Sequence, residues 1–134
     1  MIGYVMGDRD LVDKALKGST KEGKTGFLAQ LDALFSPDGY YDEGPGYQRY
    51  AIYPFVTLAE CIDHNDPGIG VFRYRDGILQ KAVNSLLQCT YEGDIFLMND
   101  AIAKDIHTYE ILFSADIAYK ASPRDKGLLD IVER

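Results

Sequence analysis

Apolar residues recur every three or four positions along most of the chain, which is the spacing of helices that bury one face. The pattern predicts helices over residues 11–16, 27–35, 45–62, 78–87 and 109–119, with a further helix from 125 to 133. The segment 109–119 is apolar nearly all round, so we expect it to be buried on most sides. Since no alternating pattern of any length competes, the sequence predicts an all-α fold of antiparallel helical hairpins.

Turn-forming residues separate the predicted helices. Ser36-Pro37-Asp38-Gly39 ends the second helix, because proline presets φ, aspartate bonds the local backbone and glycine accepts unusual dihedrals. Pro45 suits a first helical position, and Pro54 predicts a kink further along the same helix. Residues 64–68 close that helix, and we expect a loop over 91–104 with a short extended piece at 95–97.

The two ends of the chain carry no helix caps. It begins with the apolar residues of 1–4 and stops within a helical pattern near Glu133. At 134 residues the chain is one domain at most, and we expect residues 1–134 to be a single helical segment of a larger protein. Exposed apolar faces at such ends favour self-association.

The charge balance narrows the class of partner. Fourteen Lys and Arg against 21 Asp and Glu give a net charge of −7, which argues against a general nucleic-acid binder. No apolar run reaches the roughly 20 residues that span a bilayer, so we expect no membrane partner. Residues 1–10 do not have the pattern of a signal peptide, and the compartment stays open.

The sequence predicts no cofactor. Nucleotide and flavin motifs are not visible in the chain. Cys61 and Cys89 match neither a disulfide framework nor a zinc spacing, and they are expected to be buried free thiols. Asp63, His64, Asp66 and His107 have no regular ligand spacing, so no metal site is predicted.

The segment 38–50 carries four of the ten tyrosines and a candidate site. If a helix begins at Pro45, Tyr47 and Tyr50 lie on one side, and Arg49 lies on a neighbouring face with Tyr53. A glycine-flanked helix start that presents Tyr and Arg near free backbone N–H groups can hold an anionic ligand. Alternatively, the tyrosines pack a helix–helix seam with their hydroxyls at its wet edge.

The string FSPDGYYDEGPGYQRYAIYPF, residues 35–55, resembles a stretch of the bacterial heparinase II/III-type polysaccharide lyases. The likeness is greatest to the branch that includes exo-acting oligoalginate lyases. Flanking segments agree with it over essentially the whole chain: residues 3–8, 26–32, 99–100 and 115–119. The resemblance implies part of an (α/α) toroid and β-elimination on a uronic-acid glycan, alginate or heparin-like.

The resemblance also implies roles for particular residues. The tyrosine after Pro-x, here Tyr47, would serve as general acid and on some substrates also as base. Arg49 would assist it or pair with the substrate carboxylate; the alternative is a structural pair with Glu43 or another acid. Glu43 would orient the loop or cap the helix start, and Tyr41 would contact substrate.

Further positions are candidates for contact with an acidic sugar. Asn99 and Asp100 would contact sugar hydroxyls or else make an Asx-turn. The local positive charge that a polyanion requires could come only from a small set of side chains: Arg49, Arg73, Arg75, Lys81 and Lys104.

Several groups that such a lyase needs are missing from the chain. The resemblance places an Asn–His pair upstream of Met1 and further histidine and arginine residues in a later β-sheet domain. Because catalytic groups act as a unit, we expect little or no lyase activity from this chain alone. The alternative is a non-enzymatic helical module that binds acidic sugars or a protein partner.

Overall fold

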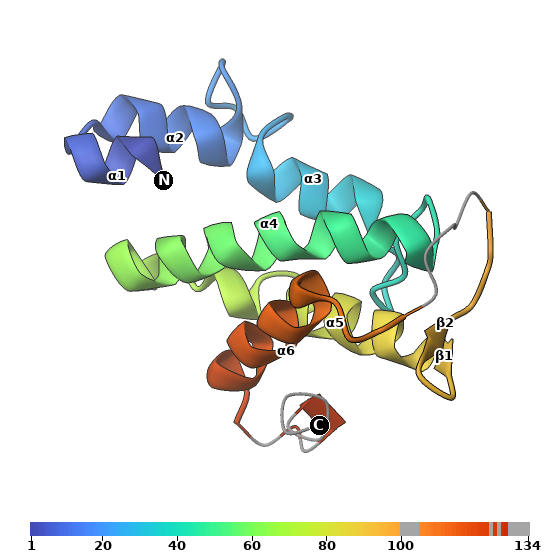
Figure 1. Cartoon of the computed structure of the whole chain (residues 1–134). Helices are drawn as coiled ribbons and strands as arrows, with labels where there is room; N and C mark the ends of the chain where they lie inside the picture. The colour runs from blue at the N-terminus through green and yellow to red at the C-terminus, as the bar shows by residue number, and fades with distance from the viewer. Residues whose placement is uncertain (100–104, 124, 126, 129–134) are drawn as a thin grey trace.

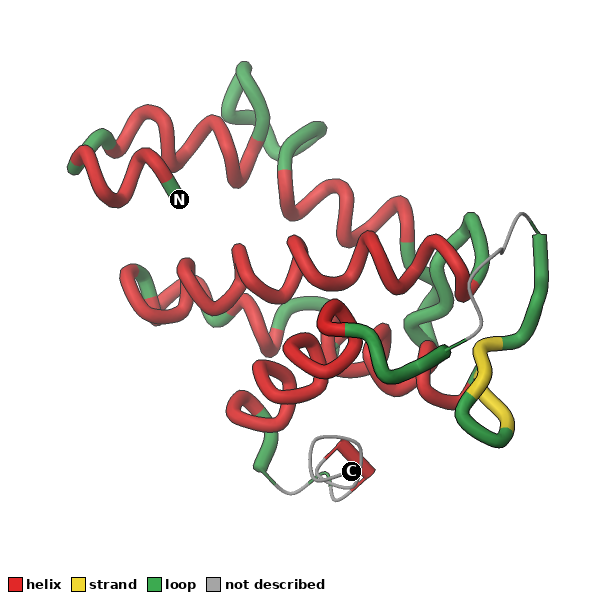
Figure 2. The backbone as a smooth tube through the Cα atoms, in the orientation of Figure 1, coloured by secondary structure: helices red, strands yellow, loops and turns green. Residues whose placement is uncertain are grey.

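The fold is all-α apart from one short hairpin, as the hydrophobic pattern predicts (Figures 1 and 2). The structure is a computed structural model, and it describes residues 1–99, 105–123, 125, 127 and 128. Its α-helices are α1 (Ile2–Met6), α2 (Arg9–Lys17), α3 (Phe27–Leu34), α4 (Pro45–Asn65), α5 (Ile78–Gln88) and α6 (Tyr109–Ala121). Two 3₁₀ turns, η1 (Pro67–Ile69) and η2 (Val71–Arg73), and two strands, β1 (Thr90–Tyr91) and β2 (Asp94–Ile95), complete the elements.

The N-terminal part folds as two helices where the sequence pattern predicted one. α1 ends at Gly7, whose left-handed φ of 66° terminates the helix. Asp8 then caps α2, because its carboxylate accepts the backbone N–H of Leu11 at 3.1 Å.

The expected loop after α5 contains a paired hairpin. Thr90 pairs with Ile95 and Tyr91 with Asp94 in antiparallel register. The turn residues Glu92 and Gly93 both have positive φ, 51° and 88°, which matches the twist of a two-residue hairpin loop. The helix predicted over 125–133 falls mostly outside the described residues, although Gly127 and Leu128 are helical.

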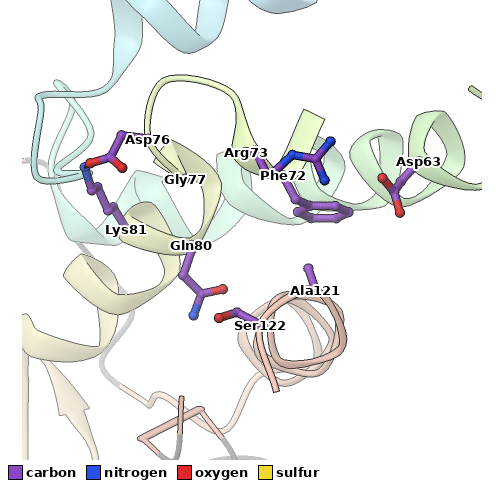
Figure 3. Close-up of a pocket in the computed structure, with 9 residues that line it drawn as sticks. All are labelled: Asp63, Phe72, Arg73, Asp76, Gly77, Gln80, Lys81, Ala121 and Ser122. Atoms are coloured by element: carbon purple, nitrogen blue, oxygen red, sulfur yellow. Dashed lines mark hydrogen bonds and ion pairs between the residues drawn. The ribbon is translucent and has the colours of Figure 1, made fainter. Parts of the chain in front are cut away.

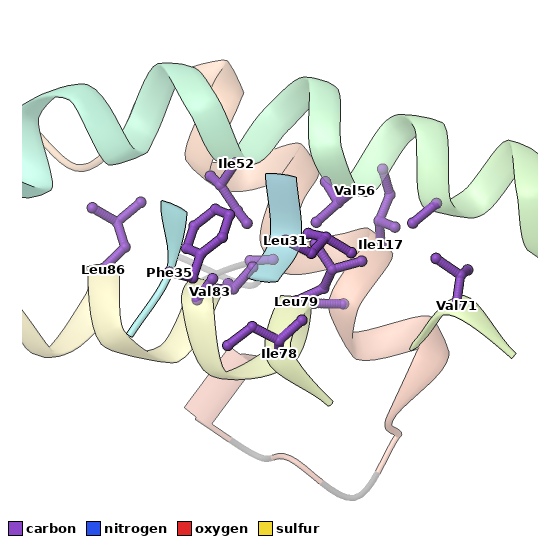
Figure 4. Packing of buried hydrophobic residues seen from close by; sticks show 14 of the residues in the cluster. Leu31, Phe35, Ile52, Val56, Val71, Ile78, Leu79, Val83, Leu86 and Ile117 are labelled. Carbon is purple, nitrogen blue, oxygen red and sulfur yellow. The ribbon is translucent and has the colours of Figure 1, made fainter. Parts of the chain in front are cut away.

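α4 is the central helix of the fold, with α2 and α3 on one side and α5 and α6 on the other (Figure 1). It runs without interruption through Pro54, whose exposed position keeps the proline ring out of the core. Figure 4 shows the core where α3, α4, α5 and α6 meet, built around Leu31, Phe35, Ile52, Val56, Leu79, Val83 and Ile117. Each such side chain contributes about 1.5–3 kcal/mol by leaving water.

Hydrogen bonds from Tyr4 and Arg75 connect α1 and α3 to neighbouring segments. The hydroxyl of Tyr4 donates to Asp66 at 2.9 Å, which joins α1 to the end of α4. The guanidinium of Arg75 donates to the carbonyl oxygens of Leu31 and Phe35 at 2.7 and 2.8 Å. Arg75 therefore satisfies the last carbonyls of α3.

The prediction that both thiols are buried is wrong in part. Cys61 and Cys89 are free but partly exposed; burial, and then the charge of Asp38, raises the pKa of the Cys89 thiol. α6 is buried on most sides, as predicted, with Tyr109 and Phe113 60% and 54% exposed. No helix among the described residues has the length and apolar content needed to cross a membrane.

Candidate functional site

The loop before α4 is held in place by one buried side chain, Gln48. Its amide nitrogen donates to the carbonyl oxygens of Gly39 at 2.9 Å and Ala82 at 2.8 Å. Its amide oxygen accepts the backbone N–H of Tyr41 at 3.1 Å. Gln48 has no exposed surface, so these bonds account for its buried polar atoms.

Sequence analysis did not single out Gln48, although a signal was present. Gln48 lies four residues before Ile52 and eight before Val56, on the apolar face of α4. A polar residue on an apolar face must find hydrogen-bond partners there. That pattern indicates a structural contact, but the identity of the partners depends on the loop and α5.

Two glycines permit the close packing at this end of α4. Gly39 has φ of 93°, and a Cβ there would lie 2.3 Å from the backbone of Lys81. Gly44 precedes the helix with φ of 91° and ψ of 173°, a conformation that is essentially reserved for glycine. A Cβ on Gly44 would lie 2.8 Å from the amide nitrogen of Asn99. The structure therefore brings Asn99 to the start of α4, as a site at this helix end requires.

Tyr47 lies in the first turn of α4 and is 44% exposed. Its neighbour one turn on, Tyr50, is also half exposed. Both belong to the outward side of the helix, as their spacing predicts. The hydroxyl of Tyr47 is thus available to a ligand at a helix N-terminus, where backbone N–H groups favour negative charge.

Arg49 is buried, with 6% of its surface exposed. Its guanidinium carbon lies 4.2 Å from the ring centroid of Tyr50, and one Nη donates to the Tyr50 hydroxyl. Among the described residues it makes no ion pair with Glu43 or another acid, and its Nε has no hydrogen-bond partner. Within the described part of the chain its charge therefore has no acid partner, and an anionic ligand at this position would stabilise it.

Tyr41 and Glu43 have different positions on the loop. Tyr41 is partly buried with its ring 5.4 Å from that of Phe35. Burial first, then the charges of Glu43 and Asp42, raise the pKa of the Tyr41 hydroxyl. Glu43 is exposed, and α4, which begins at Pro45 after Gly44, has no side-chain cap at its N-cap position.

The remaining candidates lie elsewhere. Asp100 and Lys104 are outside the described residues. His64 is near the other end of α4, and His107 pairs with Asp105 at 3.1 Å. No group of three possible metal-ligating side chains forms among the described residues.

A cavity of about 610 Å³ lies far from Tyr47, where the end of α4 faces η2, α5 and the end of α6 (Figure 3). Asp63, Phe72 and Arg73 line it, together with Lys81, which pairs with Asp76 at 2.7 Å. Asp63 is 16 positions after Tyr47, or about 24 Å along the helix. This cavity is therefore separate from the candidate site at the start of α4.

Comparison with known proteins identifies the family of the chain. A family described as alginate lyase matches residues 1–96. The chain is 51% identical over its full length to an alginate lyase of Stenotrophomonas maltophilia strain K279a. It is 48% identical, over 99% of its length, to an exo-oligoalginate lyase of Saccharophagus degradans strain 2-40. The chain belongs to the alginate lyase family. It spans 18% of the length of each of these two relatives.

Proposed function

We propose that this chain carries part of the site of a polysaccharide lyase that cleaves uronic-acid glycans by β-elimination. Tyr47 is the acid and, on some substrates, the base. The observation that supports this most directly is the half-exposed Tyr47 in the first turn of α4, with Arg49 buried two residues further on and without an acid partner among the described residues. The relatives named above act, by their names, on alginate and oligoalginate.

The reaction sets clear demands on these residues. The proton on C5 of the uronate passes to a base, the C4–O bond breaks, and the glycosidic oxygen receives a proton while a C4=C5 double bond forms. The phenol of Tyr47 gives its proton to that oxygen. The base is Tyr47 itself on some substrates and a group outside this chain on others. Negative charge that develops at this position is stabilised by the backbone N–H groups at the start of α4.

Other residues have supporting roles in this proposal. Arg49 acts through its field rather than through an exposed fork, because it is buried against Tyr50. Asn99, beside Gly44 at the start of α4, contacts sugar hydroxyls, and Asp100 is assigned the same role from its place next to Asn99 in the sequence. Tyr41 and Glu43 line the loop and orient substrate, Tyr41 from its fixed position on Phe35.

By itself the chain has little or no lyase activity in this proposal. Together with the missing groups it forms part of an (α/α) toroid. The carboxylate-neutralising Asn–His pair and the residues of the β-sheet domain are needed, and a single remaining group does not carry the reaction. A second candidate is a non-enzymatic module that binds acidic sugar or a partner, which the exposed apolar residues Ile2, Val5 and Met6 of α1 favour.

Turnover of oligoalginate and heparin-like oligosaccharides, followed by the ultraviolet absorbance of the new double bond, tests activity. We expect no turnover above background. When either oligosaccharide is added, the largest NMR chemical-shift changes are expected at Tyr47 and Arg49. The control is Tyr91→Phe, an exposed tyrosine in the hairpin. Turnover that Tyr47→Phe abolishes and Tyr91→Phe retains would overturn the expected inactivity. An absence of shifts near Tyr47 would overturn the site itself.

A further inference from the structure

α6 crosses α4 (Figure 1), and aromatic side chains of the two helices contact one another there. We call this surface the aromatic platform: Tyr50, Tyr53, Tyr109 and Phe113. The ring of Tyr53 lies edge-on to Tyr109 at 5.8 Å and 6.2 Å from Phe113. Tyr50, Tyr109 and Phe113 are each at least half exposed, so the platform offers aromatic surface to a ligand.

The platform is fixed in place before any ligand arrives. Tyr50 is held by the guanidinium of Arg49 through both its ring and its hydroxyl. Tyr53 is partly buried between the two helices. The charge of Glu110, and then its hydrogen bond, raises the pKa of Tyr109, with smaller contributions from Tyr53 and Tyr50.

This arrangement has the chemistry of a sugar-binding surface. A pyranose ring has an apolar C–H face and a rim of hydroxyls, and flat aromatic rings with phenolic tips match both. The continuity of these rings with Tyr47, the proposed catalytic residue, favours the sugar chain as the occupant. Rigid rings also lose little conformational entropy when a ligand binds.

The platform is continuous with the candidate site. Tyr47, Tyr50 and Tyr53 follow one another at three-residue intervals, or about 4.5 Å per step along the axis of α4. The exposed side of the helix thus leads from the Tyr47 hydroxyl to the crossing with α6. An elongated ligand that reaches Tyr47 passes over these rings.

We propose that the aromatic platform stacks against sugar units of the same oligouronate whose scissile bond lies at Tyr47. This inference rests on the proposed function and adds to it a second, uncharged set of contacts. The platform contributes affinity only to oligomers long enough to extend past Tyr50. A protein partner on this surface is the competing outcome of the test below.

The test measures binding of an alginate disaccharide and an alginate pentasaccharide to the 134-residue chain by NMR titration. We expect Tyr109→Ala and Phe113→Ala each to weaken pentasaccharide binding by roughly three- to tenfold, the range that one aromatic contact supplies. Disaccharide binding stays unchanged in both variants. Tyr91→Ala, which removes an equally exposed ring from the hairpin, leaves both affinities unchanged.

A second variant separates stacking from bulk apolar contact and guards against misfolding. Phe113→Leu keeps an apolar side chain but removes the flat ring, so we expect pentasaccharide binding to weaken with an unchanged unfolding midpoint. Equal pentasaccharide affinity in wild type, Tyr109→Ala and Phe113→Ala, with shifts still centred on Tyr47, would overturn this inference and leave the proposed function standing. Shifts confined to the platform would overturn the role of Tyr47 instead. No binding of either oligouronate would overturn both.

Discussion

The side-chain nitrogen of Gln48 donates a hydrogen bond to the carbonyl oxygen of Ala82 across 2.8 Å and thereby ties α4 to α5. The same buried amide also holds Gly39 and Tyr41 of the loop. Tyr47 is the residue directly before Gln48, so the position of the candidate site depends on this contact.

Replacing Gln48 by alanine leaves two carbonyl oxygens and one N–H without their partner in a buried position. We expect Gln48→Ala to lower the free energy of unfolding by about 3 kcal/mol, measured by urea denaturation. Gln30→Ala, at an exposed position on α3, should change it by less than about 0.5 kcal/mol. Equal effects of the two substitutions would contradict the role assigned to Gln48.

Gly44 combines a strained backbone with a close neighbour. In Gly44→Ala the new methyl group meets the Asn99 amide, and the backbone keeps its φ of 91° only with strain. We expect a loss of about 2–3 kcal/mol in urea unfolding and a shifted Asn99 amide resonance. Gly7→Ala is the control: Gly7 has φ of 66° but open space around it, so only a backbone cost of about 1 kcal/mol is expected. An unmoved Asn99 resonance in Gly44→Ala would show that the contact does not form.

Arg75 satisfies two carbonyl oxygens at the end of α3. Arg75→Ala removes both bonds, and we expect it to destabilise the protein by about 2 kcal/mol in thermal or urea unfolding. Arg73→Ala, two residues earlier and exposed, is the matched control and should be close to neutral. If Arg73→Ala proved the more damaging, the capping role of Arg75 would be wrong.

Tyr4 makes stability depend on pH at the alkaline end. Burial, then the hydrogen bond to Asp66, raises the pKa of Tyr4 to about 12. A raised pKa means that the contribution is complete below the ordinary value near ~10 and is lost as pH rises through about 12. We expect the urea midpoint of the wild type to fall over this range by more than that of Tyr4→Phe. Parallel pH curves for the two proteins would contradict the assignment.

α1 exposes apolar side chains beside a groove. Ile2, Val5 and Met6 are 71%, 88% and 68% exposed, and the groove between α1, α2 and α4 has a volume of about 470 Å³. We expect concentration-dependent self-association in sedimentation velocity, which Val5→Lys weakens by placing a charge in the apolar contact. Lys17→Glu, a charge change on the exposed side of α2, should have no comparable effect. A monomer at every concentration would refute the prediction.

Local patterns were enough to predict much of the fold. The helices over 27–35, 45–62 and 78–87 follow from apolar spacing and turn residues, because both act within a few positions of the chain. The hairpin at 90–95 was missed, since two-residue strands are too short to show alternation. The string around Pro45 also led directly to the alginate lyase family, which the comparisons confirm.

The sequence by itself determined which residues form helices and that Tyr47 and Tyr50 share the outward side of one of them, because helical geometry fixes both. Only the tertiary structure decided what the side chains contact. It buried Arg49 against Tyr50, assigned Arg75 to the end of α3 and brought Asn99 to Gly44. It also left Tyr109 and Phe113 exposed beside α4. These contacts depend on how segments tens of residues apart in the sequence pack together. The spacing of residues within one segment does not predict that packing.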